Sequence, residues 1–101
     1  MNVVLKKSGN TAELLLSGRI ESNTTIELEK TLLEQAKWYE SMTLDFSKVS
    51  YISSAGLRTM RKLHQEMRSK GGALRIINVR KDVMDVFQAT GFDRLLDIED
   101  L

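Results

Sequence analysis

Apolar and polar positions change their spacing several times along the chain, and each change marks an expected element. Short apolar runs at residues 3–8 and 12–17 flank Gly9-Asn10, a pair that suits the positive φ angles of a tight turn. Two further apolar runs, at residues 42–46 and 73–77, have the length and composition of strands. The chain is therefore expected to open with a β-hairpin and to continue with further strands.

Three segments between and after these strands carry apolar residues at the spacing of a helix face. The first begins among the N-cap candidates at residues 22–25 and runs to about Lys37, and the second spans about residues 54–70. Gly91 ends the third helix, and a last strand is expected at residues 95–98. The apolar faces are Leu28, Leu32 and Ala36 in the first helix, Leu57, Met60, Leu63 and Met67 in the second, and Val79, Val83, Val86 and Phe87 in the third.

The order of these elements is β-β-α-β-α-β-α-β, so strands and helices alternate after the hairpin. Such alternation favours parallel strand pairing through right-handed crossovers. A chain of 101 residues with 42% hydrophobic residues has room for one compact domain. The sequence therefore predicts an α/β fold of a single domain, residues 1–101, in which helices pack on a mixed β-sheet made of the N-terminal hairpin and parallel strands.

Composition and charge exclude several classes of function. The 15 basic and 14 acidic residues alternate along the chain, so no basic patch indicates binding to nucleic acid or to a membrane. The chain has no cysteine and a single histidine, His64, which leaves little material for a metal site. No apolar run approaches the ~20 residues that span a bilayer, and residues 2–7 lack the apolar core of a signal peptide. We expect a cytoplasmic protein with no metal, no cofactor and no catalytic residue.

The segment from Asp45 to Leu57 joins the end of a strand to the start of a helix through small, hydroxylated residues. The first turn of a helix leaves backbone N–H groups unpaired and carries the positive end of the helix dipole. Ser54 is therefore placed either to cap the helix or to accept a phosphate. For an arbitrary serine in such a position, N-capping is the ordinary role. Ala55 and Gly56 add little bulk, so we expect the ridge around Ser54 to be shaped for contact with another molecule.

The same segment resembles the signature of the STAS family, and in particular that of bacterial anti-sigma factor antagonists. The resemblance rests on Asp45-Phe46-Ser47 and on Ser53-Ser54-Ala55-Gly56-Leu57. It extends to the opening hairpin, to residues 18–21, to Gly71-Gly72 and to residues 87–92. The resemblance implies a STAS-like α/β fold and a regulatory protein that is not an enzyme.

In that family, the serine two positions before the glycine is phosphorylated, and the corresponding residue here is Ser54. The resemblance implies partner switching, in which the unphosphorylated protein binds an anti-sigma factor and so frees a sigma factor. The partner is also a serine kinase, to which the ATP and magnesium belong; phosphorylation releases the partner until a serine phosphatase removes the phosphate. Many members carry aspartate where this chain has Ser53, so Ser53 is the main rival acceptor, whereas Ala55 removes another hydroxyl.

Two charged residues are expected to join this partner surface. Glu21 occupies a place where the family often carries an acidic residue, and Arg58 lies one turn after Ser54, within reach of a phosphate there. Without the family, both would be ordinary solvated charges. The expected partner-binding residues are Glu21, Ser53, Ser54, Ala55, Gly56 and Arg58.

Two other functions stay open at this point. Asp45, near an expected strand end, could take phosphate from a histidine kinase as a receiver domain does, although Glu21 is the only carboxylate that precedes it at a strand end. Alternatively, the chain is a STAS scaffold or a ligand-binding module of a signalling assembly, and Ser54 is structural. A phosphate on serine is stable in acid whereas an aspartyl phosphate is hydrolytically labile, and a scaffold carries neither.

Overall fold

The computed structural model describes residues 1–101, and it confirms the expected order of elements with one addition, the short helix α4. No helix in the chain is long and apolar enough to cross a membrane. In chain order, the elements are β1 (Asn2–Ser8), β2 (Thr11–Ile20), α1 (Ser22–Ala36), β3 (Ser41–Ile52), α2 (Ser54–Ser69), β4 (Ala73–Val79), α3 (Lys81–Thr90), α4 (Phe92–Leu95) and β5 (Asp97–Asp100).

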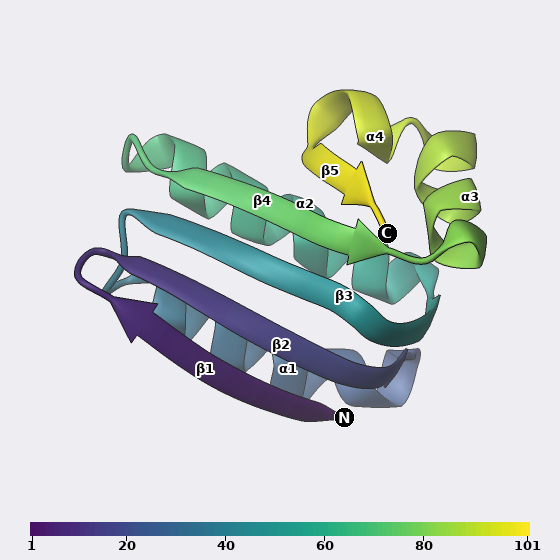
Figure 1. Ribbon diagram of the computed structural model, residues 1–101, viewed down its shortest axis with the longest axis horizontal. Helices are drawn as coiled ribbons and strands as arrows, with labels where there is room; N and C mark the ends of the chain where they lie inside the picture. Colours follow the sequence, from purple (N-terminus) through teal and green to yellow (C-terminus); the bar gives the residue numbers. More distant parts are fainter.

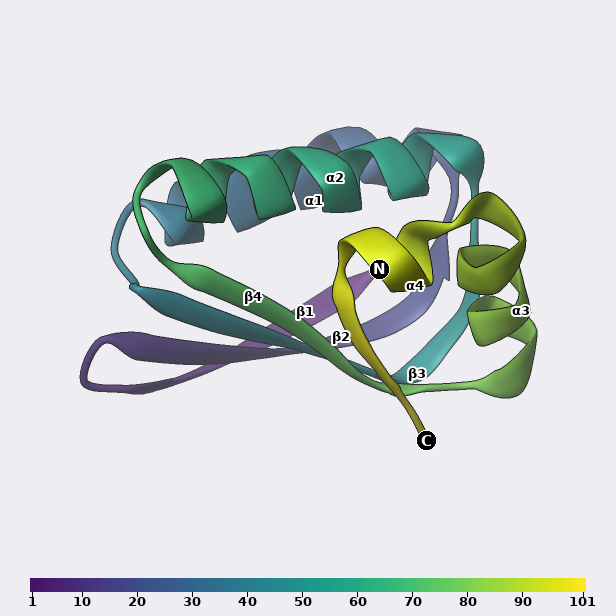
Figure 2. The same ribbon diagram turned by 90° about the horizontal axis from the view of Figure 1, so that it is seen from above.

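All five strands form one sheet in the order β1-β2-β3-β4-β5. β1 pairs with β2 in antiparallel fashion and every later pair is parallel, so the predicted mixed sheet is confirmed. The helices α1 and α2 lie side by side against one face of the sheet, and no helix covers the opposite face (Figures 1 and 2). Because each crossover leaves from the carboxyl end of a parallel strand, the helices α1, α2 and α3 all begin along the same edge of the sheet.

The hydrophobic core lies between the sheet and the two long helices. Alternate residues of β2, β3 and β4 point into it, and α1 and α2 each contribute one apolar face, as the sequence pattern predicts. Phe87 of α3 reaches Phe46 of β3, with 6.0 Å between the ring centroids, and so holds α3 against the end of the sheet. The largest fully buried side chains are those of Phe46, Phe87, Leu14, Leu16, Ile20, Leu32, Met42, Leu44, Met60, Leu63, Met67 and Ile76.

The strand β3 is longer than its apolar run at residues 42–46 predicts, because it continues to Ile52. Val49 and Ile52 are buried, and the strand stays paired with β2 up to Ile20 opposite Ile52. Two register shifts between β2 and β3 interrupt the regular alternation in this region. The expectation that this strand ends near Phe46 is therefore wrong, because the broken alternation hid its second half.

The C-terminal third also differs in detail from the expected elements. Val79 closes β4 and is buried there, instead of starting the apolar face of the third helix. Gly91 ends α3 in the left-handed conformation with a φ of 78°, which confirms the expected helix end. The chain then makes the extra turn α4, closed by a 2.8 Å hydrogen bond from the Leu96 N–H to the Phe92 carbonyl, so β5 starts only at Asp97.

Gly56 sets how closely the first turn of α2 approaches the sheet. The residue is buried, and a Cβ built on it would lie 2.6 Å from Ile20 Cγ2 and 2.8 Å from Ile52 Cγ1. Real Cβ atoms do not approach carbon atoms so closely, so only glycine fits without a shift of the neighbouring chains. The position of the α2 N-terminus therefore depends on this contact.

The substitution Gly56→Ala tests this contact, because the contact decides whether the free energy of unfolding falls or rises. Helix propensity alone would make alanine more stabilising by about 1 kcal/mol, whereas overpacking of a filled core costs about 1–3 kcal/mol. We expect the overpacking to win and the free energy of unfolding, measured in urea, to fall by about 1–2 kcal/mol. A rise in stability would show that the first turn has room for a side chain.

His64 lies on α2 at the edge of the core, where it is half-buried. Its Nε2 atom is shielded from solvent and has no hydrogen-bond partner. Burial lowers the pKa of His64 below its ordinary value of 6.5, and the charge of Arg68 lowers it further. The folded protein therefore favours a neutral imidazole at this position.

The lowered pKa predicts a loss of stability in mild acid. Below about pH 6.5 the unfolded chain binds a proton at His64 that the folded chain does not yet accept, so stability falls until the pH reaches the folded-state pKa. His64→Gln removes this contribution, and its stability should fall less than that of the parent between about pH 8 and about pH 5. Urea midpoints of both proteins across this range provide the measurement. Equal losses in the two proteins would mean that His64 titrates alike in the folded and unfolded states.

Candidate functional site

The N-termini of α1 and α2 lie next to each other at the carboxyl edge of the sheet (Figures 1 and 2). A hydrogen bond of 2.8 Å from the Ser53 N–H to the Ile20 carbonyl joins the end of β3 to the end of β2. Further along, Glu29 of α1 accepts hydrogen bonds from Thr59 at 3.1 Å and from Lys62 at 3.2 Å, both on α2. The junctions that follow β2 and β3 therefore form one continuous surface.

Ser53, not Ser54, is the N-cap of α2. Its backbone is extended, and its Oγ accepts a hydrogen bond of 3.1 Å from the N–H of Gly56. Its carbonyl accepts the Leu57 N–H at 2.9 Å, which begins the helical ladder. The capping role that the sequence allowed for Ser54 thus belongs to the preceding serine, because the helix starts at Ser54, one residue earlier than a cap at Ser54 requires.

Ser54 is the first residue of α2, and it is exposed. Its hydroxyl makes no hydrogen bond within the chain, in contrast to the Ser53 hydroxyl. At this position the side chain stands beside the unpaired N–H groups and the positive end of the helix dipole. The structure therefore leaves the Ser54 oxygen accessible and free of a structural task.

The other residues expected around Ser54 occupy different environments. Arg58 is exposed one turn further along α2 and makes no ion pair. Ala55 is half-buried, while Gly56 is buried against Ile20 and Ile52. The close approach that Gly56 permits is therefore internal, which corrects the expectation that this glycine faces another molecule.

Glu21 is the N-cap residue of α1 and lies at the same edge of the sheet. Its N–H donates to Thr24 Oγ1 at 2.9 Å, and its carboxylate pairs with Arg19 Nε at 3.0 Å. The guanidinium carbon of Arg19 lies 4.4 Å from the centre of the Tyr51 ring, in a cation–π arrangement. Arg19 thus links the end of β2 to the end of β3 on the outside of the molecule.

Glu21 and Ser53 line the same shallow, open hollow, together with Ser22, Asn23 and Tyr51. The structure therefore brings Glu21 close to Ser53. Arg19 and Tyr51 were not expected to take part in the site, although both precede inward-facing isoleucines in the sequence. Strand alternation indicates that such residues point outward, and the pairing of Arg19 with Tyr51 across β2 and β3 is the signal that could have found them.

Asp45 lies within β3 and not near a strand end, so the geometry expected of a receiver aspartate is absent. Its carboxylate accepts the Ser47 N–H at 2.9 Å. Partial burial opposes ionisation of this carboxyl, but hydrogen bonds from Ser47 and Asn78, helped by the charge of Lys48, outweigh it and hold the pKa of Asp45 below its ordinary value. The Asp45 carboxylate is therefore engaged in a local hydrogen bond within β3.

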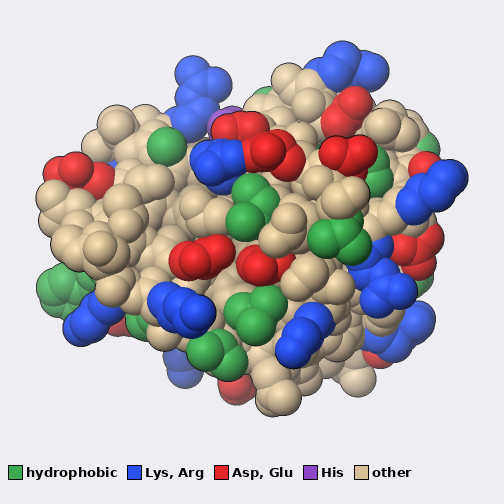
Figure 3. All heavy atoms as spheres, in the orientation of Figure 1, with side chains coloured by type: hydrophobic (Ala, Val, Ile, Leu, Met, Phe, Trp, Pro, Cys, Tyr) green, Lys and Arg blue, Asp and Glu red, His purple; other side chains and the backbone are tan.

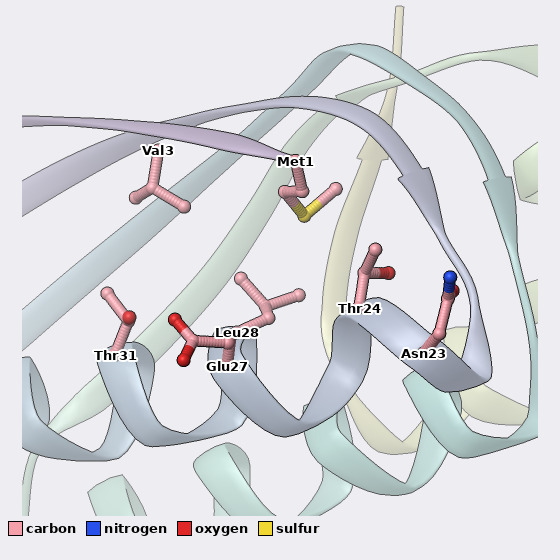
Figure 4. Close-up of a pocket in the computed structure, with 7 residues that line it drawn as sticks. All are labelled: Met1, Val3, Asn23, Thr24, Glu27, Leu28 and Thr31. Atoms are coloured by element: carbon pink, nitrogen blue, oxygen red, sulfur yellow. The ribbon is translucent and has the colours of Figure 1, made fainter.

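A separate hollow lies between β1 and α1, where Met1 and Val3 point toward Leu28 and Thr31 (Figure 4). Its only charged side chain is that of Glu27. The hollow offers a carboxylate and several small polar groups but no partner for proton transfer or for a bound anion. It shares only the α1 end with the surface around Ser54, and we assign it no function.

Comparison with known proteins identifies relatives across nearly the whole chain. The model of the STAS domain family matches residues 2–100. The chain is 30% identical over 93 residues to BtrV of Bordetella bronchiseptica, a candidate anti-sigma factor antagonist by name, covering 91% of this chain and 80% of that protein. It is 24% identical over 98 residues to the anti-sigma-B factor antagonist of Bacillus subtilis, covering 97% of this chain and 90% of that protein.

Solved structures show the same fold. A Thermotoga maritima protein, described as a candidate anti-sigma factor antagonist, superposes with a TM-score of 0.90 at 21% identity, over 98% of this chain and 86% of that one. The Bacillus cell fate determinant SpoIIAA, solved in its phosphorylated form, superposes with a TM-score of 0.75 at 15% identity, over 96% of this chain and 90% of that one. By the family match and the identity with BtrV, the chain belongs to the STAS domain family, among relatives named as anti-sigma factor antagonists.

Proposed function

We propose that this protein is an anti-sigma factor antagonist that is switched by phosphorylation of Ser54. In this proposal the unphosphorylated form binds an anti-sigma factor that is also a serine kinase, and the sigma factor is released. A phosphate on Ser54 ends the interaction, and a serine phosphatase restores it. The observation that carries the proposal is the exposed Ser54 hydroxyl, which starts α2 and makes no hydrogen bond within the chain.

The division of roles between the two serines supports Ser54 as the acceptor. The Ser53 oxygen accepts the Gly56 N–H, and Ser53 is half-buried. A phosphate on Ser53 would disturb the cap and crowd the hydrogen bond of the Ser53 N–H to Ile20. A phosphate on Ser54 would extend into solvent and leave this cap in place.

The charge of the phosphate is compatible with the fold. A phosphoserine adds about −1.5 to −2 charges at pH 7, and the N-terminus of a helix stabilises negative charge. Arg58 is exposed one turn away and has no other ion pair, so it can approach the phosphate. The phosphate therefore weakens binding of the partner and not folding, because a bulky, negatively charged group occupies a surface that the partner must cover.

The proposed partner surface is the ridge at the start of α2 with the adjoining end of α1. Ser53, Ser54, Ala55 and Arg58 form the α2 side, supported from below by the buried Gly56. Glu21 forms the α1 side. The stack of Arg19 on Tyr51 adjoins Glu21, and arginine and tyrosine side chains are enriched at the energetic centres of protein interfaces.

The chemistry of the switch belongs to the partner. ATP, magnesium and the groups that transfer phosphate lie in the kinase, and this chain contributes an acceptor hydroxyl and a docking surface. The proposed role is thus regulatory and not enzymatic, consistent with the names of the relatives.

Substitution of the two serines separates capping from phosphorylation. Ser54→Ala should leave the free energy of unfolding nearly unchanged, whereas Ser53→Ala should lower it by about 1 kcal/mol because the N-cap is lost. With the cognate kinase, ATP and magnesium, intact-mass analysis should show one added phosphate on the parent and on Ser53→Ala, and none on Ser54→Ala. A phosphate that disappears only in Ser53→Ala would move the acceptor by one residue.

Binding measurements test the consequence of the modification. Ser54→Ala should bind the anti-sigma factor as the parent does and stay bound in the presence of ATP. Ser54→Asp, which places a negative charge at the same site, should bind at least about tenfold more weakly by calorimetry while it unfolds as cooperatively as the parent. Ala89→Asp, on an exposed turn of α3, is the matched control for an added charge. Tight binding by Ser54→Asp would contradict the switch.

A further inference from the structure

The face of the sheet opposite α1 and α2 carries no helix, and it is the face seen in Figures 1 and 3. Figure 3 shows acidic, basic and apolar side chains interspersed over this face. Two shallow hollows on it are lined mainly by residues of β1, β2, β3 and β4. Apart from the stack of Arg19 on Tyr51 at the carboxyl ends of β2 and β3, this open face has no role in the function proposed above.

Five side chains of the open face stand in one row across the whole sheet. The strand pairings place Lys6 beside Glu13, Glu13 beside Thr43, Thr43 beside Arg75 and Arg75 beside Asp97. Their neighbours in sequence, such as Leu14, Leu44 and Leu74, are buried on the helix side, so strand alternation directs the row to the open side. The row, from β1 to β5, is basic, acidic, neutral, basic and acidic.

The two halves of this row are engaged differently within the chain. Arg75 pairs with Asp97 at 3.5 Å and with Glu99. Lys6 and Glu13 make no ion pair, although they lie opposite each other on β1 and β2. Two charges of opposite sign on the β1 side are therefore free for a partner.

A second row runs beside the first and is largely apolar. The pairings place Val4 beside Leu15, Leu15 beside Asp45, and Asp45 beside Ile77. Val4 is 52% exposed, and Leu15 and Ile77 are half-buried with nothing packed over them from a helix. The open face thus combines an apolar strip with an ordered row of charges.

We propose that two copies of this chain associate face to face through their open sheets, about a two-fold axis parallel to β3. Rotation about such an axis keeps the position of each row along the strand direction and reverses the order of the strands across the sheet. β1 of one copy then faces β5 of the other, β2 faces β4, and β3 faces itself. This is a symmetric contact of the kind most common among oligomers of identical chains.

The reversed row is complementary to itself in charge. Lys6 of one copy faces Asp97 of the other, and Glu13 faces Arg75, each pair occurring twice. In the apolar row, Leu15 of one copy faces Ile77 of the other. A two-fold axis perpendicular to the strands would instead place each row against a different row and lose this match. The charge order therefore selects one arrangement of a second copy.

The size of the face is that of a weak but specific interface. The five strands, about 4.8 Å apart and on average about eight residues long at about 3.3 Å per residue, cover roughly 20 Å by 26 Å. Two such faces bury roughly 1,000 Å², which is at the lower limit for specific protein interfaces. Asp45 lies near the axis and faces its own copy, which further limits the affinity. The dimer should therefore form at micromolar concentrations or above.

Association through the open face leaves the proposed switch accessible. Ser54 starts a helix on the opposite side of the sheet, so the α2 part of the partner surface does not overlap the two rows of the dimer surface (Figure 2). A dimer that forms normally in Ser54→Ala, or a switch that works in a monomeric variant, would show that the two proposals stand or fall separately.

Charge reversal provides the test. The mass of the purified protein, 11.5 kDa as a monomer, is followed by sedimentation equilibrium from about 5 μM to about 1 mM. We expect the parent to approach twice this mass, and Lys6→Glu and Asp97→Lys each to weaken association at least about tenfold. Lys30→Glu, an exposed and unpaired lysine on the helix side, is the matched control and should associate like the parent.

Mixing the two variants gives the sharpest result. In a mixed dimer of Lys6→Glu with Asp97→Lys, both contacts between β1 and β5 again join opposite charges, so the mixture should recover association that neither variant shows alone. Asp45→Asn should tighten the dimer because it removes a like charge at the axis. If Asp97→Lys does not fold, the comparison of the association of Lys6→Glu with that of Lys30→Glu still tests the proposal.

Three outcomes would overturn the proposal. The first is a parent that stays monomeric to about 1 mM, which would leave the face to solvent or to a different protein. The second is equal association of Lys6→Glu and Lys30→Glu. The third is a mixture of folded variants that does not recover association.

Discussion

The contact of Gly56 with Ile20 and Ile52 is the constraint on which the rest of the site depends. It brings the first turn of α2 against the ends of β2 and β3, where a side chain at residue 56 would not fit. The hydrogen bond from Ser53 to the Ile20 carbonyl is made at the same point. Because a buried glycine carries the packing, the exposed residues just before it are free to serve another purpose.

Two adjacent hydroxyls divide the work at this helix start. Ser53 satisfies a backbone N–H of the first turn, so its oxygen is committed to the fold. Ser54 lies one residue further and is exposed without a hydrogen-bond partner. A helix N-terminus accepts added negative charge at little cost, so modification of Ser54 changes the surface and spares the structure. Ser53 thus contributes to stability, while the adjacent Ser54 remains available for regulation.

The two faces of the sheet differ in the chemistry of their side chains. The helix side is uniformly apolar, while the open side mixes charges, hydroxyls and a few aliphatic side chains in ordered rows. Asp45 shows the consequence, since its carboxylate accepts a hydrogen bond from the Ser47 N–H on the same strand. Asp45, which the sequence allowed as a phosphate acceptor, thus has a local structural contact.

The sequence by itself determined the order of elements, the parallel crossovers and the helix faces, because apolar periodicity follows directly from which side of each element is buried. It also singled out the segment containing Ser54, through its small residues and its resemblance to the STAS family. It did not reveal the full length of β3, the extra turn α4 or the place of Val79, since register shifts and a change of element inside an apolar run leave no regular period. Only the tertiary structure decided which serine caps α2, that Gly56 faces inward and that Arg19 stacks on Tyr51, because these depend on contacts between strands and helices that are distant in sequence.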